Sequence, residues 1–328
     1  MTTAETVDAE LPDALAAARA GDSDAFQALV SPYFRSLHLH CYRMLGSYDD
    51  AEEATQDAML RAWRGLSTFE GRAPLRHWLY RIATTTCLRM IERRRRTPIS
   101  VGEITHLQPY PDRLLEQVSD VTLDPAAAVE QRETVALAFV SALQRLPATQ
   151  RAVLILRDVL AWTSAEVADL LQTSVPAVNS SLQRARTTMK ASARPTTVKA
   201  LSARERNVLD RFVRAWQDCD IQALADLLRE DAVLSMPPAS ATIVGRDRVV
   251  EFLATVPAGG RLDLIRLVPT RANGQPALAA YLPDADGQCR GYGLMVFAVV
   301  DDAVAEIVGF PDPALFERFD LPPAPPES

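Results

Sequence analysis

The chain has 328 residues, of which 48% are hydrophobic and 23% charged, and its formal net charge is −7. This length exceeds one typical hydrophobic core, so we expect two or three folded domains of a globular protein. No apolar run approaches the roughly 20 residues of a transmembrane helix, and the N-terminus lacks the basic and apolar regions of an export signal. We therefore expect a soluble, cytoplasmic protein without membrane contact.

The charge is segregated along the chain. Residues 202–328 carry 19 acidic and 12 basic residues, whereas residues 1–201 are neutral overall. Leu75–Arg96 holds seven Arg against one Glu, and the following Thr97–Glu133 is acidic. Basic segments beside acidic ones favour DNA, or acidic parts of the same chain, as partners.

Cysteine and histidine positions argue against a metal site. The four cysteines are far apart and form no Cys-x-x-Cys pair, so they resemble buried thiols. His38 and His40 lie two residues apart, which turns them to different sides of a helix. We expect no metal and no cofactor.

Residues 11–96 are expected to form a helical module. Asp24–Leu45 carries an apolar stripe at steps of three or four residues. Asp49–Arg64 begins with acids, which suits a helix N-terminus, and its alanines permit close packing. A third helix runs from Leu75 to about Arg95, after a loop over Gly65–Pro74.

The third helix combines arginines with aromatic rings. Arg neutralises phosphates, while Trp78, Tyr80 and Phe69 provide surfaces on which an unstacked base can rest. The alternative is that Trp78 belongs to the core and that the run Arg93–Arg96 is a solvated helix end.

The Pro-containing, acidic residues 97–133 are expected to be an extended linker. Two helices, Thr134–Leu146 and Gln150–Leu160, then precede a helix-turn-helix over Trp162–Lys190. Its first helix begins with a capping box of Thr163 and Glu166.

The second helix of this motif buries Val178, Leu182, Ala185 and Met189, which recur at steps of four and three. It therefore displays side chains that can pair with base edges or phosphates in the major groove. The alternative is an ordinary amphipathic hairpin with a solvated polar face. The displayed candidates are Asn179, Ser180, Gln183, Arg184 and Arg186.

Residues 202–318, after a second linker over 192–201, are expected to form an α+β domain with a curved antiparallel sheet. Asp286-Gly287 and Asp301-Asp302 fall where hairpin turns are expected. The Pro-rich residues 319–328 are expected to be a disordered tail. The predicted helices are Ala203–Asp218 and Ile221–Glu230, and the predicted strands are Ala232–Met236, Leu262–Val268, Pro276–Leu282, Gly291–Val300 and Ala303–Phe310.

The helical segments together resemble a bacterial RNA polymerase sigma factor of the extracytoplasmic-function group. DAEEATQDAMLRAW (Asp50–Trp63) is similar to the family's helix that binds core polymerase, and TFEGRAPLRHWLYRIA (Thr68–Ala83) to its promoter-melting segment. The sequence LPATQRAVLILRDVLAWTSAEVADLL, with VPAVNSSLQRAR, is similar to its upstream-element reader. The resemblance implies sigma region 2 over 11–96 and sigma region 4 over 134–191, two all-α modules.

Roles for single residues follow from this resemblance. The acidic helix would dock on the clamp of the largest polymerase subunit through Asp50, Glu52, Glu53, Gln56 and Asp57. The melted minus-10 element would contact Phe69, Gly71, Arg72, Ala73, Arg76, Trp78, Tyr80 and Arg81. Base capture would offset the few kcal/mol that flipping costs. The double-stranded minus-35 element would contact Asn179, Ser180, Gln183, Arg184 and Arg186.

Some positions depart from the family pattern. Asn179 and Ser181 are uncharged where the family commonly has Lys or Arg, and Thr85 stands where it often has Asn. Fewer phosphate contacts predict weaker and less salt-sensitive binding of the minus-35 element.

Residues 202–318 resemble the SnoaL-like, ketosteroid-isomerase-like cone fold that is fused to one subset of these sigma factors. DAVLSMPP (Asp231–Pro238) and RANGQPALAAYL (Arg271–Leu282) carry this resemblance, and the linker phrase QPYPDRLLEQ (Gln108–Gln117) is also similar to that subset. The resemblance implies that the domain regulates the sigma factor in cis, in place of a separate anti-sigma protein.

A possible small-molecule ligand would lie in a pocket of the cone. All four histidines lie outside this domain, so we expect no catalytic residue. Two alternatives remain open: a helix-turn-helix regulator with a ligand-sensing domain that does not bind core polymerase, and an isomerase or cyclase that uses Asp231. The candidate pocket residues are Trp216, Asp231, Met236, Tyr281 and Tyr292.

Overall fold

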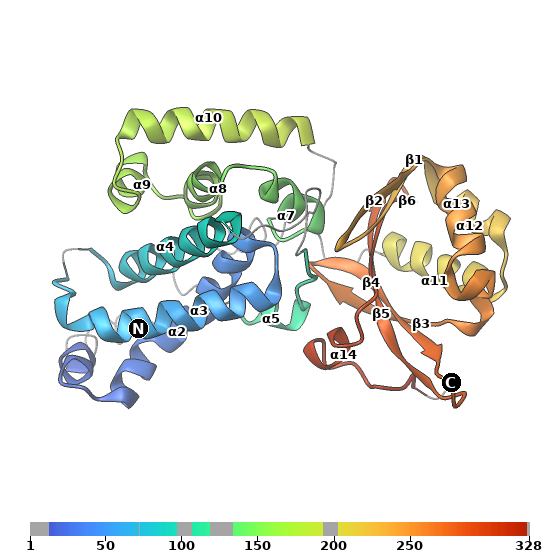
Figure 1. Cartoon of the computed structure of the whole chain (residues 1–328), viewed down its shortest axis with the longest axis horizontal. Helices are drawn as coiled ribbons and strands as arrows, with labels where there is room; N and C mark the ends of the chain where they lie inside the picture. The colour runs from blue at the N-terminus through green and yellow to red at the C-terminus, as the bar shows by residue number, and fades with distance from the viewer. Residues whose placement is uncertain (1–12, 72, 97–106, 119–133, 193–202, 327–328) are drawn as a thin grey trace. The chain divides into compact units, whose positions relative to one another are not determined.

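The computed structural model describes residues 13–71, 73–96, 107–118, 134–192 and 203–326. Its contacts divide the chain into two compact units, each described by itself (Figure 1). The helical unit takes in the described residues of 1–99, 114–134 and 139–193. The C-terminal unit takes in those of 100–113, 135–138 and 194–328. Arg72 and most of the two predicted linkers lie outside the described residues.

The first part of the helical unit consists of α2 (Ser23–Leu45), α3 (Tyr48–Gly65), the short η1 (Leu66–Thr68) and α4 (Leu75–Arg96). Asp22 caps α2, because its Oδ1 accepts from the backbone N–H groups of Asp24 and Ala25 at 2.9 and 3.0 Å. Gly46 ends α2 with a φ of 77°. The helices pack closely because the small residues of α3 are fully buried, namely Ala51, Ala54, Ala58 and Ala62.

The second part contains α7 (Leu137–Gln144), α8 (Ala148–Leu154), a π-helical turn η2 (Ile155–Val159), α9 (Ser164–Leu170) and α10 (Val175–Ser192). The predicted capping box is present: Thr163 Oγ1 accepts from the N–H of Glu166 at 3.2 Å, and Glu166 accepts from the N–H of Thr163 at 2.7 Å.

A buried arginine joins the two parts of the helical unit. Arg151 of α8 is 6% exposed, and its guanidinium donates to the carbonyl oxygens of Gln144 and Leu146 and to that of Met44 at the end of α2. Burial lowers the pKa of Arg151 to about 10. These bonds offset part of the cost of burying the cation.

The C-terminal unit is an α+β fold built on one sheet. Its elements are α11 (Ala203–Gln217), α12 (Ile221–Leu227), β1 (Leu228–Met236), β2 (Ala239–Val244), α13 (Arg246–Thr255), η3 (Pro257–Gly260), η4 (Leu262–Leu264), β3 (Arg266–Ala272), β4 (Gln275–Pro283), β5 (Cys289–Val300), β6 (Ala303–Phe310) and α14 (Leu315–Arg318). The six strands follow the order β2-β1-β6-β5-β4-β3. The predicted fold class is confirmed, with β2 and α13 as additions.

The sheet is mixed rather than purely antiparallel. β1 runs parallel to β6, whereas every other neighbouring pair is antiparallel. The predicted turn at Asp301-Asp302 joins β5 to β6, and both residues have a positive φ, at 51° and 63°. A second turn of this kind, Asn273-Gly274, joins β3 to β4 with φ of 57° and 70°.

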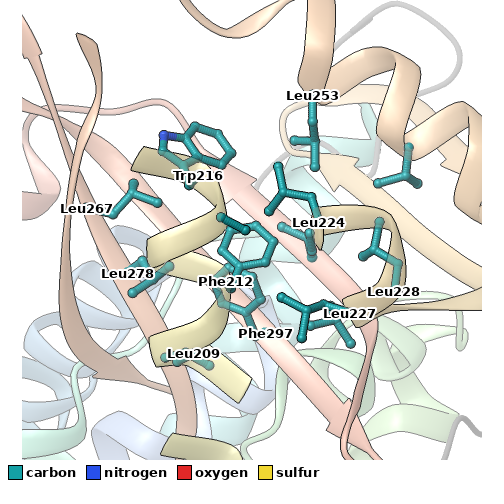
Figure 2. Close-up of a cluster of buried hydrophobic side chains, with 14 of the residues drawn as sticks. Leu209, Phe212, Trp216, Leu224, Leu227, Leu228, Leu253, Leu267, Leu278 and Phe297 are labelled. Carbon is teal, nitrogen blue, oxygen red and sulfur yellow. The ribbon is translucent and has the colours of Figure 1, made fainter. Parts of the chain in front are cut away.

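Helices α11, α12 and α13 cover one face of this sheet (Figure 1). Their apolar side chains and those of the strands form one core, in which Phe212 lies between Trp216 and Phe297 (Figure 2). Successive side chains of β4 point to opposite faces of the sheet. Leu278, Ala280 and Leu282 belong to or pack on this core.

The tail differs from the prediction of disorder. Tyr281, whose ring packs on Phe316 of α14 at 4.9 Å, donates its hydroxyl to the carbonyl oxygen of Pro322 at 3.1 Å. The N–H of Gly291 donates to the carbonyl oxygen of Pro323 at 3.0 Å. Proline carbonyls still accept hydrogen bonds, so a Pro-rich segment can be fixed to a sheet.

No helix within the described ranges combines the length and hydropathy needed to span a bilayer.

Candidate nucleic-acid interface

Helix α10 presents the predicted base-reading side chains outward. Val178, Leu182 and Ala185 are buried at 0 to 6% exposure, which fixes the rotation of the helix. The opposite side chains therefore face solvent. All five minus-35 candidates are exposed, namely Asn179, Ser180, Gln183, Arg184 and Arg186.

A shallow groove runs along part of this face. Asn179, Gln183, Arg186 and Lys190 recur at steps of four, three and four, so they form one stripe of the helix. Ser180 and Arg184 are not among the residues that line the groove. The predicted minus-35 set omitted four of its residues: Arg157 from the turn η2, and Leu182, Thr187 and Lys190 from α10.

Three of the candidates already have partners in the helical unit, and one of these contacts is the 3.4 Å hydrogen bond from Arg184 to Ser181. Arg186 pairs with both carboxylate oxygens of Asp158 at 2.7 and 2.9 Å, and this pairing raises the pKa of Arg186. Asn179 Oδ1 accepts from the hydroxyl of Ser164 at 2.8 Å. A DNA contact by any of the three residues exchanges one of these bonds, which reduces its net gain.

The predicted minus-10 residues divide into exposed and covered ones. Gly71 and Ala73 are exposed in the loop before α4. Phe69 is buried, its ring centroid 5.0 Å from that of the half-buried Trp78. The Phe69 and Trp78 rings therefore support each other, and Trp78 belongs partly to the core.

Three residues of α4 lie against α9 and against Trp162, which is two residues before it. Tyr80 is 1% exposed, with its ring centroid 5.9 Å from that of Trp162. His77 packs on the same indole at 4.2 Å. Arg81 pairs with Asp169 of α9. Arg76 lies over the Tyr80 ring at 5.5 Å. Tyr80 is therefore covered in this arrangement, whereas the side chain of Arg81 stays partly exposed.

The five candidates for polymerase binding on α3 are not equivalent. Asp50 is buried and accepts two hydrogen bonds from the guanidinium of Arg94, which makes it a packing residue. Glu52 lies 3.4 Å from His38, and the hydrogen bond from that imidazole lowers the pKa of Glu52.

The outward face of α3 contains the remaining candidates. Glu53 and Gln56 are exposed, and Asp57 is partly exposed and pairs with Arg61 at 2.8 Å. Leu60, one helical turn on, is 55% exposed. Leu60 was not among the sequence-predicted residues, and it adds an apolar side chain to this acidic face.

The turn between β3 and β4 holds the segment between the two helical modules. Asn273 is fully buried, and its Oδ1 accepts from the N–H of Tyr110 at 2.7 Å. Its own N–H donates to the carbonyl oxygen of Tyr110 at 2.8 Å, and its Nδ2 donates to the carbonyl oxygen of Val135 at 2.7 Å. One amide side chain therefore binds the backbone within the linker, at Tyr110, and just after it, at Val135.

Neighbouring residues add to this contact. Gln275 is 4% exposed; its Oε1 accepts from the N–H of Leu137 at 2.8 Å, and its Nε2 donates to the carbonyl oxygen of Phe297 at 3.2 Å. Asp112 accepts from Arg271 at 2.7 Å and from the N–H of Gly274 at 2.6 Å. We call Arg271, Asn273, Gly274 and Gln275 the linker clamp.

The predicted pocket residues divide into those that line a cavity and those that do not. An apolar cavity of about 160 Å³ lies between the sheet and its helices, and Trp216, Met236 and Tyr292 line it. Tyr281 points to the other face of β4, where burial raises its pKa. Asp231 is exposed and pairs with Arg229 at 2.9 Å. Neither side chain lines this cavity, because Tyr281 lies on the other face of β4 and Asp231 lies on an exposed part of β1.

Three family models match the chain. Sigma-70 region 2 matches residues 29–97, Sigma-70, region 4 matches residues 136–189, and the SnoaL-like domain matches residues 209–307. The first two ranges contain α3, α4 and all but the last three residues of α10, which carry the candidate interface, and the third contains the linker clamp.

Individual relatives agree with these models. The chain is 42% identical over 325 residues to the ECF RNA polymerase sigma factor SigG of Mycobacterium tuberculosis, covering 93% of this chain and 85% of that protein. It is 36% identical over 182 residues to SigM of the same organism, covering 56% of this chain and 82% of that protein. The crystal structure of the M. tuberculosis extracytoplasmic function sigma factor SigJ matches with a TM-score of 0.61 at 25% identity, covering 88% of this chain and 99% of that one. The chain therefore belongs to the extracytoplasmic-function RNA polymerase sigma factors, with a SnoaL-like domain after its two sigma regions.

Proposed function

We propose that this sigma factor directs RNA polymerase core to its promoters through two separate DNA contacts, and that it does so in the cytoplasm. Sigma factor domains imply core polymerase and promoter DNA as partners. The groove of α10, with Gln183, Arg186 and Lys190, reads the double-stranded minus-35 element. The loop before α4, with Gly71, Ala73 and the supporting Trp78, takes the melted minus-10 strand. The chain is a specificity subunit, and not an enzyme.

The polymerase contact is assigned to the outward face of α3. Glu53, Gln56 and Leu60 are the exposed residues that combine acidic, amide and apolar groups on one side of this helix. Interfaces commonly bury an apolar centre within a polar rim, and Leu60 with its neighbours has that composition. The clamp of the largest polymerase subunit is the proposed partner.

The C-terminal unit regulates the sigma factor in cis by holding the linker between regions 2 and 4. The observation that supports this role is the buried Asn273 amide, which binds Tyr110 and Val135 on the two sides of residues 119–133. A buried amide that loses these partners pays a desolvation cost of about 1–3 kcal/mol. The clamp therefore favours one arrangement of the linker.

We assign an inhibitory direction to this regulation. Tyr80 and Arg81 must leave Trp162 and Asp169 before α4 can contact a melted strand. A linker held at two points restricts that separation, whereas a released linker permits it. Release of the clamp therefore favours promoter opening.

The assignment is tested by mapping transcript starts. Core polymerase is incubated with the full chain and genomic DNA, and transcript 5′ ends are sequenced. We expect starts at one class of promoter. The variant Gln275→Met is expected to use the same starts with higher yield. Random starts contradict the sigma assignment, and an unchanged or lower yield from Gln275→Met contradicts the inhibitory clamp.

A further inference from the structure

The C-terminal unit contains a cavity that the sigma activity does not use. It has a volume of about 160 Å³ and is lined by side chains such as Leu234, Met236 and Leu253. Val256 and Tyr292 line it and are 56% and 44% exposed, so they mark an opening to solvent. Tyr292 carries the only titratable side chain among the described residues of the lining.

One buried donor in this lining has no partner. Trp216 is 2% exposed, and within the described part of the chain its indole Nε1 has no hydrogen-bond acceptor. Buried indole N–H groups usually find a partner, and an unsatisfied buried donor is destabilising. A ligand that brings an acceptor to this group removes that cost.

The cavity also limits the charge and size of its ligand. Apolar cavities of about 150 Å³ can bind molecules such as benzene. An ionised ligand would lose its hydration here without gaining a counter-charge. The occupant must therefore be neutral and small, with a single polar atom.

A continuous set of contacts links this cavity to the linker clamp within the C-terminal unit. The rings of Trp216 and Phe212 lie 5.9 Å apart, and those of Phe212 and Phe297 lie 5.0 Å apart in an edge-to-face arrangement (Figure 2). The carbonyl oxygen of Phe297 accepts from Gln275, which in turn accepts from the N–H of Leu137. Movement of the Trp216 ring therefore alters the packing of Phe297 on β5, and the carbonyl oxygen of Phe297 binds the side chain of Gln275.

We infer that the cavity is an effector site for a neutral molecule of one or two rings with one hydrogen-bond acceptor for Trp216, and that its occupation tightens the linker clamp. Filling the cavity gives the Trp216 ring contacts that it otherwise lacks, and this favours the packed arrangement of Phe212 and Phe297. The regulatory consequence rests on the proposed function of the clamp, whereas ligand binding does not.

Three probes of similar shape test the ligand chemistry on the full chain. They are 1-tetralone, the hydrocarbon 1-methylenetetralin in which CH₂ replaces the ketone oxygen, and the anion 1-naphthoate. The methyl NMR signals of Met236 and Met295, which both line the cavity, report binding. We expect 1-tetralone to bind about fivefold more tightly than 1-methylenetetralin, as one hydrogen bond allows, and 1-naphthoate not to shift these signals.

Two variants locate the contact. Trp216→Phe retains a ring but lacks the N–H, so it is expected to bind the ketone and the hydrocarbon equally. Ala280→Leu adds volume to the lining and is expected to abolish binding of both. Absence of 1-tetralone binding to the wild type, a ketone preference retained by Trp216→Phe, or binding retained by Ala280→Leu would each overturn the ligand assignment.

Hydrogen exchange tests the link to the clamp. With saturating 1-tetralone, the Leu137 amide is expected to exchange about fivefold more slowly, within the usual range of coupling between sites. The Gln288 amide, which bonds to Asp284 at 2.9 Å in the β4–β5 loop, serves as the control and is expected not to change. Probe binding without slower Leu137 exchange overturns the coupling.

Linkage provides an independent check that does not involve transcription. If the ligand strengthens the Gln275 contact, then Gln275→Met must weaken 1-tetralone binding by the same factor as the change in Leu137 protection. Unchanged affinity contradicts the coupling. A clamp without any effect on transcription would instead contradict the proposed function and leave these binding results intact.

Discussion

Tyr80 of α4 is buried beneath Trp162, which lies two residues before α9, with ring centroids 5.9 Å apart. The same helix contributes His77 and Arg81 to this contact, which places the predicted strand-separating face of region 2 against region 4. The structure therefore represents an arrangement in which α4 and α9 must separate before Tyr80 can contact DNA.

Weakening the α4–α9 contact should increase binding of a melted minus-10 strand. Asp169→Ser removes the partner of Arg81, and since exposed ion pairs contribute about 0–1 kcal/mol, affinity for a single-stranded minus-10 oligonucleotide is expected to rise by at most about fivefold. Asp57→Ser is the matched control, because it breaks the exposed Arg61–Asp57 pair away from α9. Fluorescence anisotropy measures both. A lower affinity of Asp169→Ser for the oligonucleotide, or an equal rise in affinity for Asp57→Ser, would contradict the idea that contact with α9 covers the DNA-binding face of α4.

The two kinds of residue on α3 should respond differently to substitution. Glu53→Lys and Leu60→Ala alter the exposed face, so they are expected to weaken binding to core polymerase while changing the free energy of unfolding by less than about 0.5 kcal/mol. Asp50→Asn removes the charged partner of Arg94 and is expected to lower that free energy by about 1–3 kcal/mol. Urea unfolding and a polymerase pull-down separate these effects. A stable Asp50→Asn with lost polymerase binding would assign Asp50 to docking instead.

Substitutions of two residues in the α10 groove should show which one contacts phosphates and which one contacts bases. Lys190→Ala is expected to weaken binding to all duplexes and to reduce the slope of log affinity against log salt by about one. Gln183→Ala is expected to cost about 1–3 kcal/mol on the cognate minus-35 element alone. Arg204→Ala, an exposed cation of the C-terminal unit, is the control for net charge. Equal losses on cognate and unrelated DNA for Gln183→Ala would exclude it as a base reader.

His40 should make the stability of the helical unit depend on pH. Burial, with a smaller contribution from Arg43, lowers the pKa of His40 from 6.5 to about 3. Below pH 6.5 the unfolded chain binds a proton at His40, whereas the folded chain does not bind it until the pH approaches 3. The free energy of unfolding therefore decreases as the pH falls from 6.5 towards 3. The loss approaches about 1.4 kcal/mol per pH unit.

The variant His40→Gln should remove this pH dependence. Glutamine can still bond to Thr84, whose Oγ1 lies 2.9 Å from His40 Nε2, but it does not titrate. Urea unfolding gives the slope of unfolding free energy against pH, which measures how many more protons the unfolded state binds than the folded state. We expect this number to be smaller in the variant, by up to one proton. An identical slope in both proteins would show that His40 does not carry the effect.

Local patterns predicted much of the helical unit. The apolar stripe of the second motif helix identified its outward face, and the Thr163–Glu166 box identified the start of α9, because both depend on residues within two turns. Arg157 was missed because it enters the groove from a π-helical turn that the pattern of α8 does not indicate. The burial of Tyr80 depends on Trp162, which lies 82 positions later, and periodicity does not reveal such a partner.

The C-terminal unit shows a similar division. The Asn273-Gly274 pair is a strong hairpin signal, so the turn was predictable from the sequence. The contact between the Asn273 amide and the linker backbone was not predictable, because no sequence pattern indicates which distant residue a buried Asn will bind. Tyr281 was predicted to line the pocket. Ala280 and Leu282 face the cavity, so Tyr281 between them faces the other side of β4.

The central claim is that the linker clamp restrains promoter opening, and the rate of open-complex formation tests it most directly. Asn273→Gly keeps the positive φ of the turn but removes the amide that binds Tyr110 and Val135. Asp302→Gly makes the same change in the β5–β6 turn, which is not part of the clamp. With saturating core polymerase on one promoter, we predict a rate at least about threefold above wild type for Asn273→Gly, equivalent to part of one buried hydrogen bond, and an unchanged rate for Asp302→Gly. An Asn273→Gly rate equal to or below that of the wild type would contradict the account.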